Sequence, residues 1–142
     1  MKITIMKGLP ASGKTTAARE IVKKSGNTVR VNRDDLRAMA FDGKWSGPRE
    51  KFIIAAEKAI AECAKEHGLN VVIDDTNLSR DPWTQWAKDH GMEVARHDLT
   101  SVPIAECIDR DMRREKAVGP GVIYRLAASG GLLPFTGRPI VI

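Results

Sequence analysis

The clearest chemical signature in the sequence is Gly8-Leu-Pro-Ala-Ser-Gly-Lys-Thr15, in which two glycines, a lysine and a hydroxyl residue stand at fixed spacing. This spacing matches the G-x-x-x-x-G-K-[ST] pattern, a glycine-rich turn whose backbone N–H groups face phosphates at the start of a helix. It predicts a nucleoside triphosphate site, with Lys14 at the β- and γ-phosphates and Thr15 on Mg²⁺. A glycine-rich turn that binds no nucleotide is the competing interpretation. The predicted contacts are Gly8, Pro10, Ala11, Ser12, Gly13, Lys14, Thr15 and Thr16.

Two carboxylates, Asp74 and Asp75, follow the apolar run Val71-Val72-Ile73. A triphosphate site of this type uses an acidic group near the metal or the waters around it. Adjacent residues of an extended strand point to opposite faces, so only one of the two carboxylates can face the site. We expect it to be Asp75, acting on the metal through a water molecule. The alternative is that these residues cap a helix that begins near Pro82.

A second constellation, Asn32-Arg-Asp-Asp-Leu-Arg37, follows another apolar run. Its Asp34 and Arg37 are three residues apart, which places them on one face of a short helix. A carboxylate and a guanidinium in one small volume predict a general base and an anion clamp for a phosphate acceptor. A solvent-exposed helix cap with a local salt bridge is the other interpretation of this spacing.

Arginines gather further along the chain. Arg110 and Arg114 stand four residues apart on an expected helix over 103–115, and Arg113 lies beside them. Such a face can fold over a triphosphate and neutralise the charge that moves to the leaving oxygen. The spacing alone does not choose one of these arginines. An exposed, charged helix is the alternative.

These segments need elements that bring them together. β-branched apolar runs, each followed by polar residues or a turn, predict strands over 3–6, 28–31, 69–73 and 93–99. Helical patterns lie between and after them, over 15–24, 34–41, 48–67, 82–90, 103–115 and 122–128. The alternation predicts an α/β fold of the P-loop NTPase type: a doubly wound parallel sheet flanked by helices, with ligands beyond the carboxyl ends of the strands. The arginine-bearing helix would form its lid.

Two helices have expected buried faces. The face of 48–67 that packs on the sheet is predicted to hold Phe52, Ala56, Ala59, Ile60 and Cys63, with charged residues opposite. Trp83 and Trp86 are predicted core residues. Cys63 and Cys107 lack the paired spacing of a zinc site or a disulfide, so both are expected to be buried thiols.

Length and composition set the outer limits. The 142 residues fit one domain, and 42% hydrophobic with 29% charged residues is typical of a globular protein and excludes disorder. A net charge of +5 favours polyanionic partners. The sequence contains no signal peptide and no membrane-spanning segment, so a cytoplasmic protein is expected. We expect a kinase-type domain over 1–129 and a loosely structured tail over 130–142.

Taken together, the motifs resemble the kinase domain of phage-type polynucleotide kinase/phosphatase. The resemblance covers nearly the whole chain, and the Asn-Arg-Asp-Asp-x-x-Arg block followed by Asp75-Thr-Asn-Leu78 is more specific than the phosphate-binding loop alone. It implies transfer of the γ-phosphate of ATP or another nucleoside triphosphate to 5′-hydroxyl ends of DNA or RNA, as in end repair. The general base falls on Asp34, and Arg37 holds the phosphate 3′ to the reacting nucleotide.

The same resemblance extends to other residues and partners. The resemblance maps the lid arginines to Arg110 and Arg114 and implies that Arg114 is the catalytic one, although Arg113 leaves that assignment open by one residue. We also expect substrate contacts from Asp75, Thr76 and Asn77. Members of the family often carry a phosphatase domain after the kinase, and 137–142 resembles the first strand of such a domain. Three other functions stay open: a small-molecule kinase for a nucleoside, sugar or antibiotic, a non-catalytic nucleotide-binding module, and a plain nucleic-acid binder.

Overall fold

The protein is described from a computed structural model, which places residues 1–78 and 81–133. Four parallel strands, β1 (Lys2–Lys7), β2 (Thr28–Val31), β3 (Asn70–Ile73) and β4 (Glu93–Asp98), form one sheet in the order β2-β3-β1-β4. Ile73 pairs with both Ile5 and Val31, so the carboxyl ends of β1, β2 and β3 lie at one edge of the sheet. The loops that carry the predicted site residues follow these ends.

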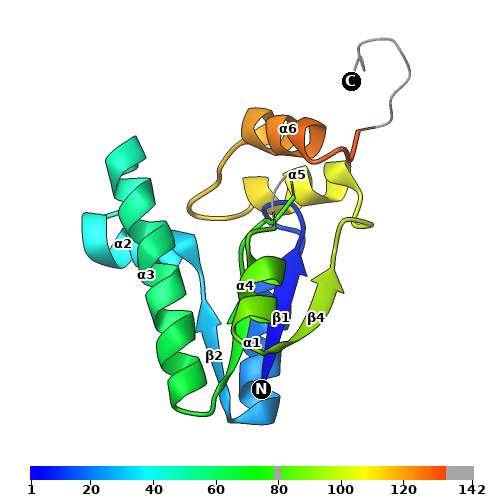
Figure 1. Cartoon of the computed structure of the whole chain (residues 1–142). Coiled ribbons are helices and arrows are strands. Elements are labelled where there is room, and N and C mark those ends of the chain that lie inside the picture. The colour runs from blue at the N-terminus through cyan, green and yellow to red at the C-terminus, as the bar shows by residue number, and fades with distance from the viewer. Residues whose placement is uncertain (79–80, 134–142) are drawn as a thin grey trace.

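Helices cover both faces of the sheet (Figure 1). Their bounds are α1 (Lys14–Ser25), α2 (Arg33–Phe41), α3 (Gly47–Glu66), α4 (Trp83–Asp89), α5 (Ile104–Met112) and α6 (Pro120–Ser129). The alternation of strands and helices confirms the predicted α/β fold, with a parallel sheet between layers of helix. No helix within the described parts of the chain is both long enough and apolar enough to cross a membrane.

Period-two alternation in the strands assigns each residue to one face of the sheet. Ile5 and Ile73 belong to a core cluster with the buried residues of α3 and α4, among them Trp83 and Trp86, as predicted. Met6 and Val72 belong instead to a cluster with α1. The two faces of β1 and β3 are therefore buried against different helices.

A third cluster lies beyond the carboxyl edge of the sheet. Cys107 of α5 and Ile123 and Ala127 of α6 pack on Leu9 and Leu78, which belong to the loops after β1 and β3. The pair α5 and α6 is thus mounted directly on the phosphate-binding loop (Figure 1). Arginines carried by this pair can reach the loop without a large movement.

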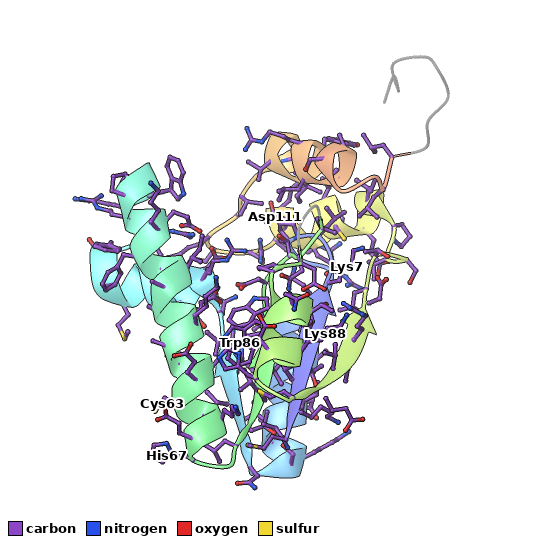
Figure 2. All side chains as sticks on the ribbon, viewed as in Figure 1. Lys7, Cys63, His67, Trp86, Lys88 and Asp111 are labelled. Atoms are coloured by element: carbon purple, nitrogen blue, oxygen red, sulfur yellow. The ribbon has the colours of Figure 1, made fainter. Side chains whose placement is uncertain are left out.

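The predicted buried face of α3 was wrong by one residue. Phe52 is 57% exposed and Cys63 is exposed, whereas Ile53, Glu57, Ala61 and Ala64 are buried. The charge of Glu57 caused the error, because a hydrophobicity pattern assigns a glutamate to solvent and so rotates the helix. Figure 2 shows Cys63 and His67 at the end of the molecule opposite to α5.

Helix α5 is shorter than predicted. It ends at Met112, and Arg113 caps it, because the buried carboxylate of Asp111 accepts hydrogen bonds from the backbone N–H groups of Val118 and Gly119 and turns the chain. The predicted strand over 137–142 lies outside the described residues. The division into a domain over 1–129 and a tail therefore stays a prediction.

The orientation of α3 can be tested by truncating neighbouring side chains. Ile53→Ala should lower the free energy of unfolding by about 2–5 kcal/mol, because it leaves a cavity in the fully buried face. Phe52→Ala is the matched control and should cost much less, since most of its ring is in solvent. Urea denaturation followed by circular dichroism measures both. A larger loss for Phe52→Ala would contradict the observed helix orientation.

Candidate active site

The phosphate-binding loop between β1 and α1 depends on two unusual backbone features. A Cβ atom on Gly8 would lie 2.6 Å from the Ser12 hydroxyl oxygen, so only glycine fits that close approach. Gly13 has a φ of 103° at the start of α1, a left-handed conformation that favours glycine. The N–H of Gly8 donates to the carbonyl oxygen of Thr76 at 3.1 Å, which ties the loop to the segment after β3.

Lys14 and Thr15 open helix α1 and project into the site. Lys14 is only 9% exposed, and its ammonium group donates to the carbonyl oxygen of Leu9 at 2.7 Å. Burial lowers the pKa of Lys14 from its ordinary value, and the carboxylate of Asp74 opposes that effect. The Thr15 hydroxyl donates to Asp74 Oδ2 at 2.9 Å. A cation and a hydroxyl are therefore fixed beside the loop.

Asp74, rather than Asp75, contacts the phosphate-binding loop through Thr15, although both carboxylates line the cleft described below. The choice of Asp75 for the metal stays a prediction, and this geometry favours Asp74 instead. Two residues before Asp74, Val72 packs against α1, and the alternation of the strand sends Asp74 to that same side. Asp74 is fully buried, and Arg30 Nε donates to its Oδ2 at 2.9 Å. Its Oδ1 has no hydrogen-bond partner among the described residues.

The three residues after Asp74 have different surroundings. Asp75 points toward α2 and α3, where its Oδ1 accepts from the backbone N–H of Arg33 at 3.0 Å. Thr76 lines the cleft described below. Asn77 does not: it is buried, with a φ of 48°, and its amide donates to the carbonyl oxygen of Met6 at 2.7 Å. The predicted substrate contact from Asn77 is thus replaced by a contact within the protein.

The first turn of α2 is fixed to the end of β3. The side chain of Asn32 accepts from the backbone N–H of Asp35 at 2.8 Å, as a helix cap, and donates to the carbonyl oxygen of Asp74 at 2.5 Å. Asp34 follows in this turn with its side chain 85% exposed. Arg37 donates to Asp34 at 2.8 Å through Nη1 and to Glu50 of α3 at 2.8 Å through Nη2. Helix α3 therefore holds Arg37 beside Asp34.

Arg110 of α5 and Arg114 of the turn after it lie across the site from α2. Arg110 Nη1 lies 3.5 Å from the carbonyl oxygens of Ala11 and Ser12 in the phosphate-binding loop. Arg114 forms an ion pair with the buried carboxylate of Asp111, whereas Arg113 is 76% exposed and pairs with Asp109 on the outer side. The geometry thus favours Arg114 over Arg113 as the arginine of the cleft.

Asp111 holds Arg114 and the turn after α5 in place. Burial alone raises the pKa of its carboxyl group, but hydrogen bonds from Arg114 and from the backbone N–H groups of Val118 and Gly119 hold that pKa below its ordinary value. The ionised carboxylate therefore keeps Arg114 in place. Figure 2 shows Asp111 beside the carboxyl ends of the strands.

These groups enclose one open cleft of about 730 Å³, large enough for a nucleotide and part of a second substrate. Lys14, Asp34 and Arg37 all line it. Of the predicted loop contacts, Gly8 and Ser12 are buried behind the lining and support the turn. The lining residues are Pro10, Ala11, Gly13, Lys14, Thr15, Thr16, Asn32, Arg33, Asp34, Arg37, Glu50, Asp74, Asp75, Thr76, Arg110, Arg114 and Val118.

Four charged residues of the site, or next to it, were missed by sequence reasoning. Arg30 neutralises Asp74, Arg33 contacts Asp75, Glu50 holds Arg37, and Glu57 lies beneath Arg33. Arg33 stands inside the Asn-Arg-Asp-Asp block and could have been proposed from its position there. Nothing in the sequence marks the two glutamates, because their partners come from another helix.

Comparisons with known proteins agree with this geometry. The model of the AAA domain family AAA_33 matches residues 3–123. A chain of the Pnkp1/Rnl/Hen1 RNA repair complex is 28% identical, with a TM-score of 0.77, over 92% of this chain and 44% of that one. A chain from another structure of the Pnkp1/Rnl/Hen1 complex is 32% identical, with a TM-score of 0.64, over 77% of this chain and 38% of that one.

A more distant structure shares the fold alone. A gluconokinase from Sinorhizobium meliloti 1021 is 16% identical, with a TM-score of 0.61, and the match covers 90% of this chain and 74% of that one. The present chain spans less than half the length of the two Pnkp1/Rnl/Hen1 chains that it matches. The resemblance to polynucleotide kinases and the predicted P-loop fold are both confirmed by these matches. The chain belongs to the AAA domain family AAA_33, as a P-loop domain of the kinase type.

Proposed function

We propose that the protein is a polynucleotide 5′-hydroxyl kinase, which transfers the γ-phosphate of ATP to the 5′-hydroxyl end of DNA or RNA. The observation that carries this proposal is the placement of Asp34 and Arg37 on the wall of the same cleft as Lys14. A triphosphate on the loop and an acceptor beside α2 would then meet inside one volume. Similarity to two chains of RNA repair complexes, at 28% and 32% identity, supports a nucleic-acid acceptor.

The proposed reaction is an in-line transfer. The carboxylate of Asp34 accepts the proton of the 5′-hydroxyl group while the 5′ oxygen attacks the γ-phosphorus. The bond from the γ-phosphorus to the bridging oxygen breaks, and ADP leaves. Lys14 and Arg114 stabilise the negative charge on the moving phosphoryl group and on the leaving oxygen, and Arg37 binds an anionic group of the acceptor. Positioning of the two substrates supplies most of the rate enhancement.

The residues present fit a magnesium ion bound together with the triphosphate. Thr15 offers a hydroxyl oxygen, and the neighbouring Asp74 has a carboxylate oxygen with no protein partner in the described residues. Among the described residues, no three acidic, histidine or cysteine side chains are grouped so that they could hold a metal ion by themselves. Mg²⁺ bound with a triphosphate usually takes most of its ligands from phosphates and water. When bound, Mg²⁺ would neutralise charge between the β- and γ-phosphates.

The proposal also covers the setting of the reaction. A role in end repair in the cytoplasm, with residues 1–129 as the kinase domain and a phosphatase domain after it, would agree with relatives more than twice as long as the match. A small-molecule kinase would use the same triphosphate half of the cleft. The two functions differ only in which acceptor Arg37 and its neighbours select.

The proposed base is tested by Asp34→Asn. We expect transfer of labelled phosphate to a 5′-hydroxyl oligonucleotide to fall by roughly 10²- to 10⁴-fold, because an amide cannot accept the proton. Nucleotide affinity should change much less than transfer, since Asp34 is hydrogen-bonded to Arg37 of its own helix and acts on Lys14 through its charge. Asp42→Asn, at the exposed end of α2, serves as the matched control and should keep full activity. Full activity in Asp34→Asn would remove this residue from the reaction.

The choice of Asp74 over Asp75 as the metal-side carboxylate is tested by calorimetry. Asp74→Asn should weaken binding of the magnesium–ATP complex on the order of tenfold to a hundredfold, because the metal loses a charged neighbour. Binding of ATP in excess EDTA provides the internal control and should change little. Equal losses with and without the metal would show that Asp74 supports the loop but does not act on magnesium.

A further inference from the structure

A buried glutamate lies beneath the acceptor side of the cleft and has no part in the reaction proposed above. Glu57, in the middle of α3, is 2% exposed, whereas Glu50 and Glu62 on the same helix have side chains that are 19% and 53% exposed. Its Oε2 atom has no hydrogen-bond partner in the described parts of the chain. An ionised carboxylate in that position would be costly, so the residue needs an explanation.

The surroundings of Glu57 contain more negative than positive charge. Arg33 Nε lies 3.4 Å from both Glu57 Oε1 and Asp75 Oδ2, and Arg33 Nη1 lies 3.3 Å from Glu50 Oε1. Three carboxyl groups thus face the Arg33 guanidinium group, and of these Glu50 is also paired with Arg37. Glu57 and Asp75 are both buried and share the single positive charge of Arg33, so the two cannot both be ionised at low cost.

A single proton on Glu57 would remove one negative charge and would supply the missing hydrogen bond between Glu57 and Asp75. Asp75 Oδ2, like Glu57 Oε2, is buried and has no hydrogen-bond partner among the described residues. Burial raises the pKa of Glu57 to about 10, the neighbouring carboxylate of Asp75 adds to the rise, and the charge of Arg33 opposes it. Glu57 is therefore neutral at physiological pH and can donate to the Asp75 carboxylate.

Asp75 connects this buried acid to the reacting groups. Its other oxygen, Oδ1, accepts from the backbone N–H of Arg33, the first residue of α2, and the next residue is Asp34. A carboxylate that turned away would release both the backbone and the side chain of Arg33. The position of Asp34 in the cleft then depends on what holds Asp75 in place.

We propose that Glu57 is a positioning residue: as a neutral carboxylic acid it donates a hydrogen bond to Asp75, and the pair fixes Arg33 and the first turn of α2 against the cleft. This inference rests on the proposed role of Asp34. It assigns Glu57 no contact with either substrate. It also explains why a charged residue occupies the buried face of a helix that otherwise packs through apolar side chains.

Two substitutions show whether Glu57 acts as a neutral hydrogen-bond donor or as a charged partner. Glu57→Gln keeps the shape and supplies an amide N–H to Asp75, so kcat/KM for a 5′-hydroxyl oligonucleotide should stay within about threefold of the wild type. Glu57→Ala leaves Asp75 unpartnered and should lower kcat/KM at least about tenfold, with the KM for ATP unchanged. Glu62→Gln, on the exposed face of α3, is the control. A Gln variant as impaired as Ala, or a fully active Ala variant, would overturn the proposal.

Stability as a function of pH tests the proton without any activity assay. Glu57 titrates near 4.5 in the unfolded chain and near 10 in the folded protein, so the folded state binds the extra proton between these values and stability falls as pH rises. Glu57→Gln removes this slope, while Arg33, Asp75 and Glu50, which face Glu57, remain. The melting temperature of the variant should exceed that of the wild type by several degrees at pH 8, and the gap should narrow toward pH 5.

A gap that does not change with pH would overturn the neutral state of Glu57. The stability result also separates this inference from the proposed function. If the wild type phosphorylates no 5′-hydroxyl end, the function fails, and the melting curves still decide whether Glu57 holds a proton. If Glu57→Ala fails to fold, the activity and the pH-dependent melting temperature of Glu57→Gln decide the question.

Discussion

One buried carboxylate, that of Asp74, joins the segments on which the cleft depends. It accepts from Thr15 at the start of α1 and from Arg30 of β2, and its backbone carbonyl oxygen accepts from Asn32 at the start of α2. A fully buried charge is tolerated only with close partners, so these contacts hold each other in place. The phosphate-binding loop and the acceptor helix are thereby fixed at one end of the same strand.

Side chains alternate between the two faces of the sheet along β3, so the neighbouring residues Asp74 and Asp75 point to different sides of the cleft. Asp74 points to the side of α1, where we propose that the triphosphate binds, whereas Asp75 points to the side of α2 and α3, where we propose that the acceptor binds. Because the two side chains leave a single strand end in opposite directions, the two halves are held at a fixed separation. Arg110 and Arg114 close the third side from a pair of helices that packs on the loop itself.

Much of this arrangement could be predicted from the sequence. Strand and helix bounds were correct to within one or two residues for most elements, because β-branched runs and helical periodicity are local signals. The phosphate-binding loop and the Asp34–Arg37 pair were also found from spacing alone. The rotation of α3 was predicted wrongly, and the contacts of Asp75 and Asn77 within the protein were not foreseen. All three depend on buried polar side chains whose partners come from distant segments.

The residues that sequence reasoning missed follow the same rule. Glu50 and Glu57 lie 13 residues or more beyond Arg37, and only the packing of α3 on α2 brings them under the site. Arg30 of β2 is in register with Val72 of β3, and its role becomes visible only from its ion pair with Asp74, directly after β3. Local pattern identifies the groups that react, whereas tertiary structure identifies the groups that hold them.

The central claim is that a single cleft brings a triphosphate to a nucleic-acid end. The most direct measurement offers the protein labelled ATP with competing acceptors: 5′-hydroxyl DNA, 5′-hydroxyl RNA, a nucleoside 3′-phosphate, a bare nucleoside and gluconate. We predict transfer to the 5′-hydroxyl ends and to the nucleoside 3′-phosphate, and little or none to the bare nucleoside or gluconate. Preferential phosphorylation of gluconate or of the bare nucleoside would contradict the assignment.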